Sequence, residues 1–69
     1  MPVLIYGKDG CPYTAAARED HSQRKIAFEY VNVVADPARL KEMLKHSKGV
    51  RKVPVIVDGD KVTIGFNGT

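Results

Sequence analysis

Cys11 is the single cysteine of this 69-residue chain and its strongest candidate for covalent chemistry. It lies between Gly10 and Pro12. Proline is favoured at the first position of a helix, so we expect Cys11 to be the N-cap residue. At that point the free N–H groups of the first turn and the aligned peptide dipoles place roughly half a positive charge beside the sulfur. The pattern therefore predicts a nucleophilic thiolate at neutral pH.

Two neighbouring side chains can strengthen this effect. The Thr14 hydroxyl can donate a hydrogen bond to the sulfur across the first turn, as can the N–H groups of Tyr13 and Thr14, and Lys8 can add a positive charge from the preceding loop. The alternative is that Cys11 is a small buried hydrophobic residue, as many free cysteines are. Its place at a loop-to-helix junction favours the reactive interpretation.

Pro54 is the second informative residue. A proline that opens an apolar strand removes a hydrogen-bond donor, and it usually marks a sheet edge or a tight cis turn. If the Val53–Pro54 bond is cis, the main chain of Val53 can pair with an extended peptide beside the cysteine. The alternative is an ordinary strand start.

The elements that position these residues follow from hydrophobic pattern and from Gly and Pro punctuation. Asp36 and Pro37 are expected to begin the second helix and Gly49 to cap its end, while Asp58 to Asp60 should form a hairpin turn. The predicted order is a strand at 3–6, a helix from 12 to about 25, a strand at 28–33, a helix at 37–48, and an antiparallel hairpin of strands 53–57 and 61–64. This βαβαββ order predicts one α/β domain over residues 1–69, with a four-stranded mixed sheet and helices on both faces.

Composition excludes several classes of protein. The net charge of +3 comes from scattered basic residues rather than a basic stripe, which argues against nucleic-acid binding. One cysteine and two isolated histidines, His21 and His46, predict no metal site. No apolar run could span a bilayer and no signal peptide is evident, so we expect a cytoplasmic protein without a membrane partner.

The chain resembles the glutaredoxins of the thioredoxin superfamily over nearly its whole length. The resemblance is carried by Cys-Pro-Tyr-Thr after the first strand, Val-Pro-Val before the hairpin, and Gly-Phe-Asn-Gly near the end. It implies a thioredoxin-like fold, disulfide exchange at Cys11, and a cis bond before Pro54. It also implies that glutathione is a co-substrate, and that its site is formed by Lys8, Tyr13, Arg51, Val53 and the segment 65–69, with Gly65 and Asn67 as contacts.

Three departures from the family pattern change the expected mechanism. Thr14 stands where dithiol members carry a resolving cysteine, so the resemblance implies a monothiol cycle completed by glutathione or a partner thiol. The family's C-terminal helix is absent from the pattern, which predicts marginal stability or self-association. We expect the protein to be a monomer or a weak homodimer. Asn67 and its neighbours lack the aspartate of many glutathione-dependent members, which leaves glutathione and thioredoxin reductase both open as electron donors.

Further interpretations come from the same residues. The segment around Cys11 is similar to short bacterial glutaredoxin-like proteins, some of which carry selenocysteine at the nucleophile. Alternative functions are an iron–sulfur carrier assisted by glutathione and a thiol or selenol peroxidase. Asp20 with Arg24, and Glu42 with His46, have the i, i+4 spacing of surface pairs on helices.

Overall fold

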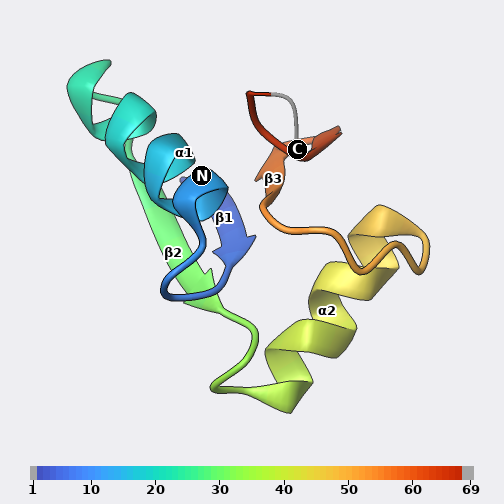
Figure 1. Cartoon of the computed structure of the whole chain (residues 1–69). Helices are drawn as coiled ribbons and strands as arrows, with labels where there is room; N and C mark the ends of the chain where they lie inside the picture. The colour runs from blue at the N-terminus through green and yellow to red at the C-terminus, as the bar shows by residue number, and fades with distance from the viewer. Residues whose placement is uncertain (1, 68–69) are drawn as a thin grey trace.

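The computed structural model describes residues 2–67 of the chain, and its elements follow the predicted βαβαββ order (Figure 1). The strands are β1 (Val3–Gly7), β2 (Phe28–Asn32), β3 (Val55–Asp58) and β4 (Lys61–Ile64), and the helices are α1 (Pro12–Gln23) and α2 (Pro37–Ser47). Most predicted boundaries lie within one or two residues of these bounds. The first strand extends one residue beyond the predicted range 3–6, to Gly7, which pairs with Asn32.

The four strands form one mixed sheet in the order β2-β1-β3-β4. β1 pairs with β2 in parallel, and the terminal hairpin adds β3 and β4 as antiparallel strands. The parallel pair is joined through α1, as the crossover rule requires. The expected thioredoxin-like α/β fold is therefore confirmed.

Each face of the sheet has its own apolar cluster, because successive side chains of a strand point to opposite sides. Tyr6, Val31, Val55 and Val57 pack with Met43 of α2. Ile5 and Ile56 pack on the other face with Ala17 of α1. One helix therefore covers each face, and alanine is the fully buried apolar residue that α1 contributes.

Both helices end in conformations that the sequence did not indicate. The first helix was expected to reach Lys25, but Lys25 has a φ of 58° and lies outside it. The N–H groups of Lys25 and Ile26 donate to the carbonyls of Ser22 and His21, which is a Schellman motif with lysine in the glycine position. In α2 the C-cap is Lys48, with a φ of 56°, and not Gly49 as predicted.

The hairpin turn is one residue shorter than predicted. Asp58 belongs to β3 and pairs with Lys61, so only Gly59 and Asp60 form the turn. Gly59 has a φ of 60°, which glycine adopts at little cost. The strand β3 also begins at Val55 rather than Val53, which leaves Val53 and Pro54 in the connection before it.

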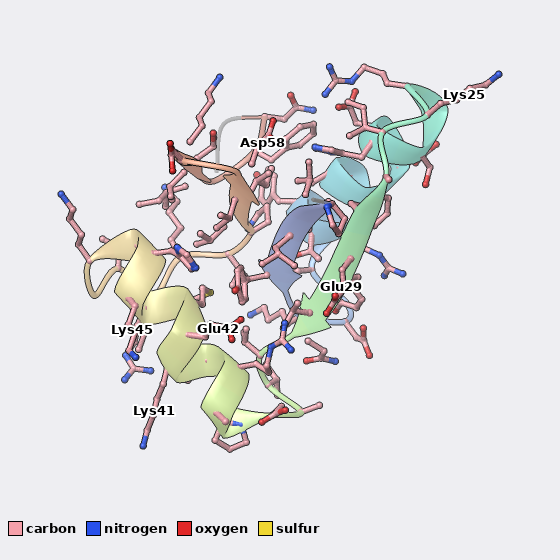
Figure 2. The ribbon with its side chains drawn as sticks, turned by 180° about the vertical axis from the view of Figure 1, so that it is seen from behind. Lys25, Glu29, Lys41, Glu42, Lys45 and Asp58 are labelled. Atoms are coloured by element: carbon pink, nitrogen blue, oxygen red, sulfur yellow. The ribbon has the colours of Figure 1, made fainter. Side chains whose placement is uncertain are left out.

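A polar network joins α2 to the sheet and replaces the predicted Glu42–His46 pair. The buried Tyr6 hydroxyl donates to Glu42, and Arg39 lies 3.3 Å from both Glu42 and Glu29 of β2. Figure 2 shows Glu42 and Glu29 on the side where α2 meets the sheet. Burial, reinforced by the hydrogen bond to Glu42, raises the pKa of Tyr6. The other predicted pair, Asp20 with Arg24, is present at 2.9 Å.

Within residues 2–67, neither helix has the length and apolar character needed to cross a membrane.

Candidate active site

Cys11 is the N-cap residue of α1, as predicted. Its backbone is extended, with φ −86° and ψ 117°, and its carbonyl accepts the first helical hydrogen bond from Ala15 at 3.0 Å. Pro12 follows at the first helical position. The Cys11 side chain is only 9% exposed, so a reaction partner has to approach it from one side. The thiol therefore lies where the free N–H groups of a helix converge.

The surroundings of Cys11 favour its thiolate. The pKa of the Cys11 thiol is lowered first by the Thr14 hydroxyl and the Thr14 N–H, while burial opposes this effect and the Tyr13 N–H and the Lys8 charge add to it. Thr14 is almost completely buried, and its Oγ1 has no hydrogen-bond partner among the described residues. A thiolate is the acceptor that this hydroxyl lacks, and a buried hydroxyl without a partner is costly. Thr14 therefore stabilises the charged form of the sulfur.

Gly7 fixes the position of Thr14, a role that sequence reasoning missed. A Cβ atom added at Gly7 would lie 2.4 Å from Cγ2 and 2.6 Å from Oγ1 of Thr14. The Thr14 side chain thus packs directly on the β1 backbone, which only glycine permits. The two residues are seven positions apart on different elements, so no local sequence signal indicates the contact.

A second group missed by sequence reasoning anchors the loop that leads to Cys11. The Tyr30 hydroxyl of β2 donates to Asp9 at 2.8 Å, and the Arg18 guanidinium lies 4.0 Å from the centre of the Tyr30 ring. Burial and the hydrogen bond to Asp9 raise the pKa of Tyr30 to about 12, and the charge of Cys11 contributes in the same direction. Tyr30 therefore holds the loop between β1 and α1.

The Val53–Pro54 peptide bond is cis, as the resemblance implied. Pro54 is buried, and its carbonyl accepts a hydrogen bond from the Gly65 N–H at 2.7 Å. Gly65 has a φ of 90°. The structure thereby brings the predicted residues Pro54 and Gly65 together.

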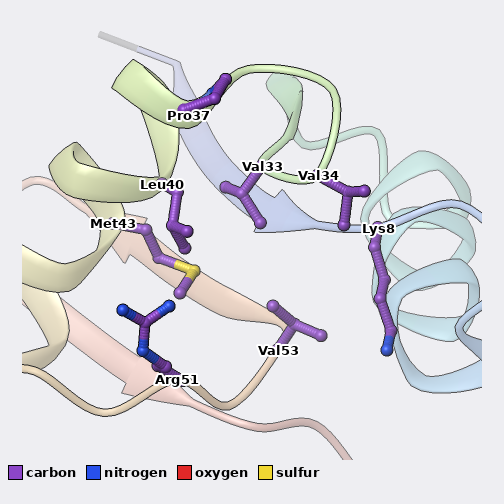
Figure 3. Close-up of a pocket in the computed structure, with 8 residues that line it drawn as sticks. All are labelled: Lys8, Val33, Val34, Pro37, Leu40, Met43, Arg51 and Val53. Carbon is purple, nitrogen blue, oxygen red and sulfur yellow. The ribbon is translucent and has the colours of Figure 1, made fainter.

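Lys8, Arg51 and Val53 lie around one groove, although they come from segments far apart in the sequence (Figure 3). Tyr13 is 41% exposed and lies in the first turn of α1, two residues after Cys11. Asn67 is exposed and does not line this groove, so the structure does not gather it with the other predicted contacts. The predicted contacts at 68–69 lie outside the described residues.

No group of three or more His, Cys, Asp or Glu residues within positions 2–67 is arranged to hold a metal ion. The chemistry that these residues can support is nucleophilic attack by a stabilised thiolate, beside cations that suit an anionic substrate.

Comparison with protein families also points to thiolate chemistry. The glutaredoxin family model matches residues 3–62. The chain belongs to the glutaredoxin family. It is a glutaredoxin-like redox protein with the thioredoxin fold, and this family carries out thiol–disulfide exchange. No curated protein sequence gives a significant match.

Several solved structures are similar to the structure of this chain. The glutaredoxin-like protein NrdH-redoxin from Escherichia coli, described as having a thioredoxin-like activity profile, is 31% identical with a TM-score of 0.83, covering 97% of this chain and 86% of its own. A glutaredoxin from Archaeoglobus fulgidus is 28% identical with a TM-score of 0.85, and the match covers 94% of this chain and 75% of that glutaredoxin. A glutaredoxin from Brucella melitensis is 31% identical with a TM-score of 0.73, and the match covers 94% of this chain and 70% of that glutaredoxin.

Proposed function

We propose that this protein reduces disulfides by a monothiol cycle in which Cys11 is the nucleophile. The observation that carries the proposal is the placement of Cys11 at the N-cap of α1 with a buried, unpartnered Thr14 hydroxyl beside it. A helix N-terminus with such donors is the setting of reactive cysteines. Because Thr14 takes the place of a second cysteine, no disulfide can form within the chain.

The cycle has two exchange steps. The Cys11 thiolate attacks the glutathione sulfur of a mixed disulfide, a new disulfide forms between Cys11 and glutathione, and the substrate leaves as a thiolate that takes a proton from solvent. The thiolate of a second glutathione then attacks the glutathione sulfur on Cys11. This step releases glutathione disulfide and restores the Cys11 thiolate. The net reaction converts one mixed disulfide and one glutathione into one substrate thiol and one glutathione disulfide.

Glutathione is the proposed co-substrate because the groove presents cations to its carboxylates. Lys8 and Arg51 line the groove from two segments, and charge-assisted hydrogen bonds from such groups are short and strong. The Val53 main chain forms no hydrogen bond with another residue of the described chain, which leaves it free to pair with the extended tripeptide. A cycle that consumes glutathione requires a reducing compartment, which supports the cytoplasm as its location.

The direct test couples the protein to glutathione, glutathione reductase and a small mixed disulfide, and follows nicotinamide oxidation. We expect turnover that disappears in Cys11→Ser. Thr14→Cys is the informative second variant, because it restores a partner thiol one helical turn away and should allow an internal disulfide. Absence of turnover by the unaltered protein, together with an unreactive Cys11, would contradict the proposal.

A further inference from the structure

The loop between β1 and α1 is exposed and leads directly to Cys11. Lys8, Asp9 and Gly10 are all exposed, and Gly10 has a φ of 80°, a conformation that glycine does not restrict by itself. Because β1 and β2 are parallel, the loop after β1 lies beside the end of β2 (Figure 1). Contacts from β2 are therefore well placed to hold this loop.

Asp9 brings a negative charge close to the nucleophile. Only Gly10 separates Asp9 from Cys11, so the Cα atoms of Asp9 and Cys11 are at most about 7 Å apart. A nearby like charge disfavours a thiolate. The groups that lower the Cys11 pKa, Lys8 among them, would be opposed by a freely moving Asp9 carboxylate. An acidic residue at this position therefore weakens the thiolate unless its side chain is held.

Tyr30 holds the Asp9 side chain from β2. The Tyr30 hydroxyl donates to Asp9 Oδ1 at 2.8 Å, and the Arg18 guanidinium lies 4.0 Å from the centre of the Tyr30 ring. Among the described residues no cation forms an ion pair with Asp9, so the Tyr30 hydroxyl is the group that binds its carboxylate. Arg18 belongs to the helix that Cys11 begins, so this cluster joins β2, the loop and α1.

We propose that Tyr30 is a positioning residue for Cys11, which holds the Asp9 carboxylate and offsets part of its charge so that the sulfur remains a thiolate at neutral pH. The inference rests on the proposed function, because that function requires the thiolate. Loss of the Tyr30 hydroxyl has two effects of the same sign. The freed carboxylate acts on the sulfur with its full charge, and it competes for Lys8, a cation that favours the thiolate. Both effects disfavour the charged sulfur.

The pH dependence of Cys11 alkylation by iodoacetamide tests this role in Tyr30→Phe, which keeps the ring and its contact with Arg18. The Tyr30–Asp9 hydrogen bond is exposed, so its loss should leave the protein folded. We expect the pH of half-maximal rate to rise by about 0.3 to 0.5 unit and the rate at lower pH to fall about two- to threefold, because a unit charge about 7 Å away through solvent has an effect of this size. Potassium chloride at about 1 M should remove most of the shift, because it screens charges over about 3 Å.

Asp9→Asn distinguishes an effect of charge from a simple loosening of the loop. The asparagine carbonyl can still accept the Tyr30 hydrogen bond, but it carries no charge. In the Asp9→Asn background, Tyr30→Phe should therefore shift the midpoint by no more than about 0.1 unit. A loop that is merely loosened would give the same shift with either residue at position 9.

Tyr6→Phe is the matched control. The Tyr6 hydroxyl also donates to a carboxylate, that of Glu42, but it does so in the network between α2 and the sheet. Its removal should lower the unfolding free energy and leave the alkylation midpoint unchanged.

The possible failures are distinguishable. An unchanged midpoint in Tyr30→Phe, an equal shift in both Asp9 backgrounds, or the same shift in Tyr6→Phe would overturn the positioning role and leave the proposed function intact. A midpoint at or above about pH 8.5 in the unaltered protein would overturn the proposed function and this inference with it.

Discussion

At the residue scale, Thr14 is the side chain through which the fold acts most directly on the Cys11 sulfur. Its buried hydroxyl is the first cause of the lowered Cys11 pKa. In the proposed monothiol cycle Thr14 has two effects: it leaves no internal thiol to resolve a mixed disulfide, and it stabilises the attacking thiolate.

Thr14→Val keeps the shape of the side chain and removes the hydroxyl. Hydrogen bonds to charged groups contribute roughly 1.5 to 3 kcal/mol, so we expect iodoacetamide to alkylate Cys11 about tenfold more slowly at pH 7. Thr14→Ser is the matched control and should remain close to the unaltered protein. If the valine variant reacts as fast as the serine variant, the hydroxyl does not stabilise the thiolate.

Gly7→Ala tests the packing that holds Thr14 in place. A Cβ atom 2.4 Å from Cγ2 forces the structure to shift, and overpacking of this kind typically costs about 1 to 3 kcal/mol of unfolding free energy. Thr14→Ala removes the two closest atoms, so in that background Gly7→Ala should cost less than half as much. Urea unfolding of the four proteins measures the coupling. Purely additive costs would show that the two side chains do not interact.

At the element scale, sequence reasoning succeeded where a helix start has a local signal. Gly-Cys-Pro placed Cys11 at an N-cap, and Asp36 with Pro37 began α2, because the chemistry of an N-cap depends on adjacent residues. The helix ends were placed wrongly because lysine, not glycine, adopts the left-handed conformation at Lys25 and Lys48. The N–H groups of the residues that follow, Ile26 and Gly49, donate to the carbonyls of His21 and Leu44.

The parts of the site that could not be predicted depend on contacts between elements. Glu42 was assigned to a helix-surface pair, but tertiary packing directs it to the Tyr6 hydroxyl of β1. The Thr14–Gly7 contact and the Tyr30–Asp9 hydrogen bond likewise join different elements. The groove of Figure 3 is formed by residues from three segments, none of which indicates a site by itself.

The hydrogen bond from Tyr30 to Asp9, which ties β2 to the active-site loop, makes a prediction about alkaline pH. The pKa of Tyr30 is about 12 in the folded protein, against about 10 in an unfolded chain. Its contribution to stability is therefore complete below pH 10 and is lost as the pH rises through about 12.

Tyr30→Phe removes that contribution, so the variant should lose less unfolding free energy than the unaltered protein between pH 10 and 12. Tyr6, whose pKa is also raised, is retained in both proteins and accounts for part of the remaining loss. Urea unfolding across this pH range measures the difference. An equal loss in both proteins would be inconsistent with the Tyr30–Asp9 hydrogen bond.

At the scale of the whole molecule, a small domain divides its apolar residues between two faces. Neither cluster is large, and β4 leaves Val62 and Ile64 37% and 40% exposed. Chains of this length bury only about 60% of the surface that they expose when unfolded. These features support the prediction of marginal stability.

We expect an unfolding free energy below about 5 kcal/mol for the reduced protein, measured by urea denaturation at neutral pH. Repeating the measurement over a range of protein concentrations separates intrinsic stability from self-association, because association makes the midpoint depend on concentration. A clearly higher unfolding free energy at every protein concentration would contradict the prediction of marginal stability. The two small apolar clusters would then be sufficient to stabilise the fold.

The thiolate character of Cys11 underlies the proposed cycle. The alkylation rate of Cys11 as a function of pH tests this character most directly. An ordinary cysteine reaches half of its maximal rate near pH 8.5. We predict that Cys11 reaches half of its maximal rate below that pH, because Thr14, Tyr13 and Lys8 favour the charged sulfur. A midpoint at or above pH 8.5 would contradict a nucleophilic role for this cysteine.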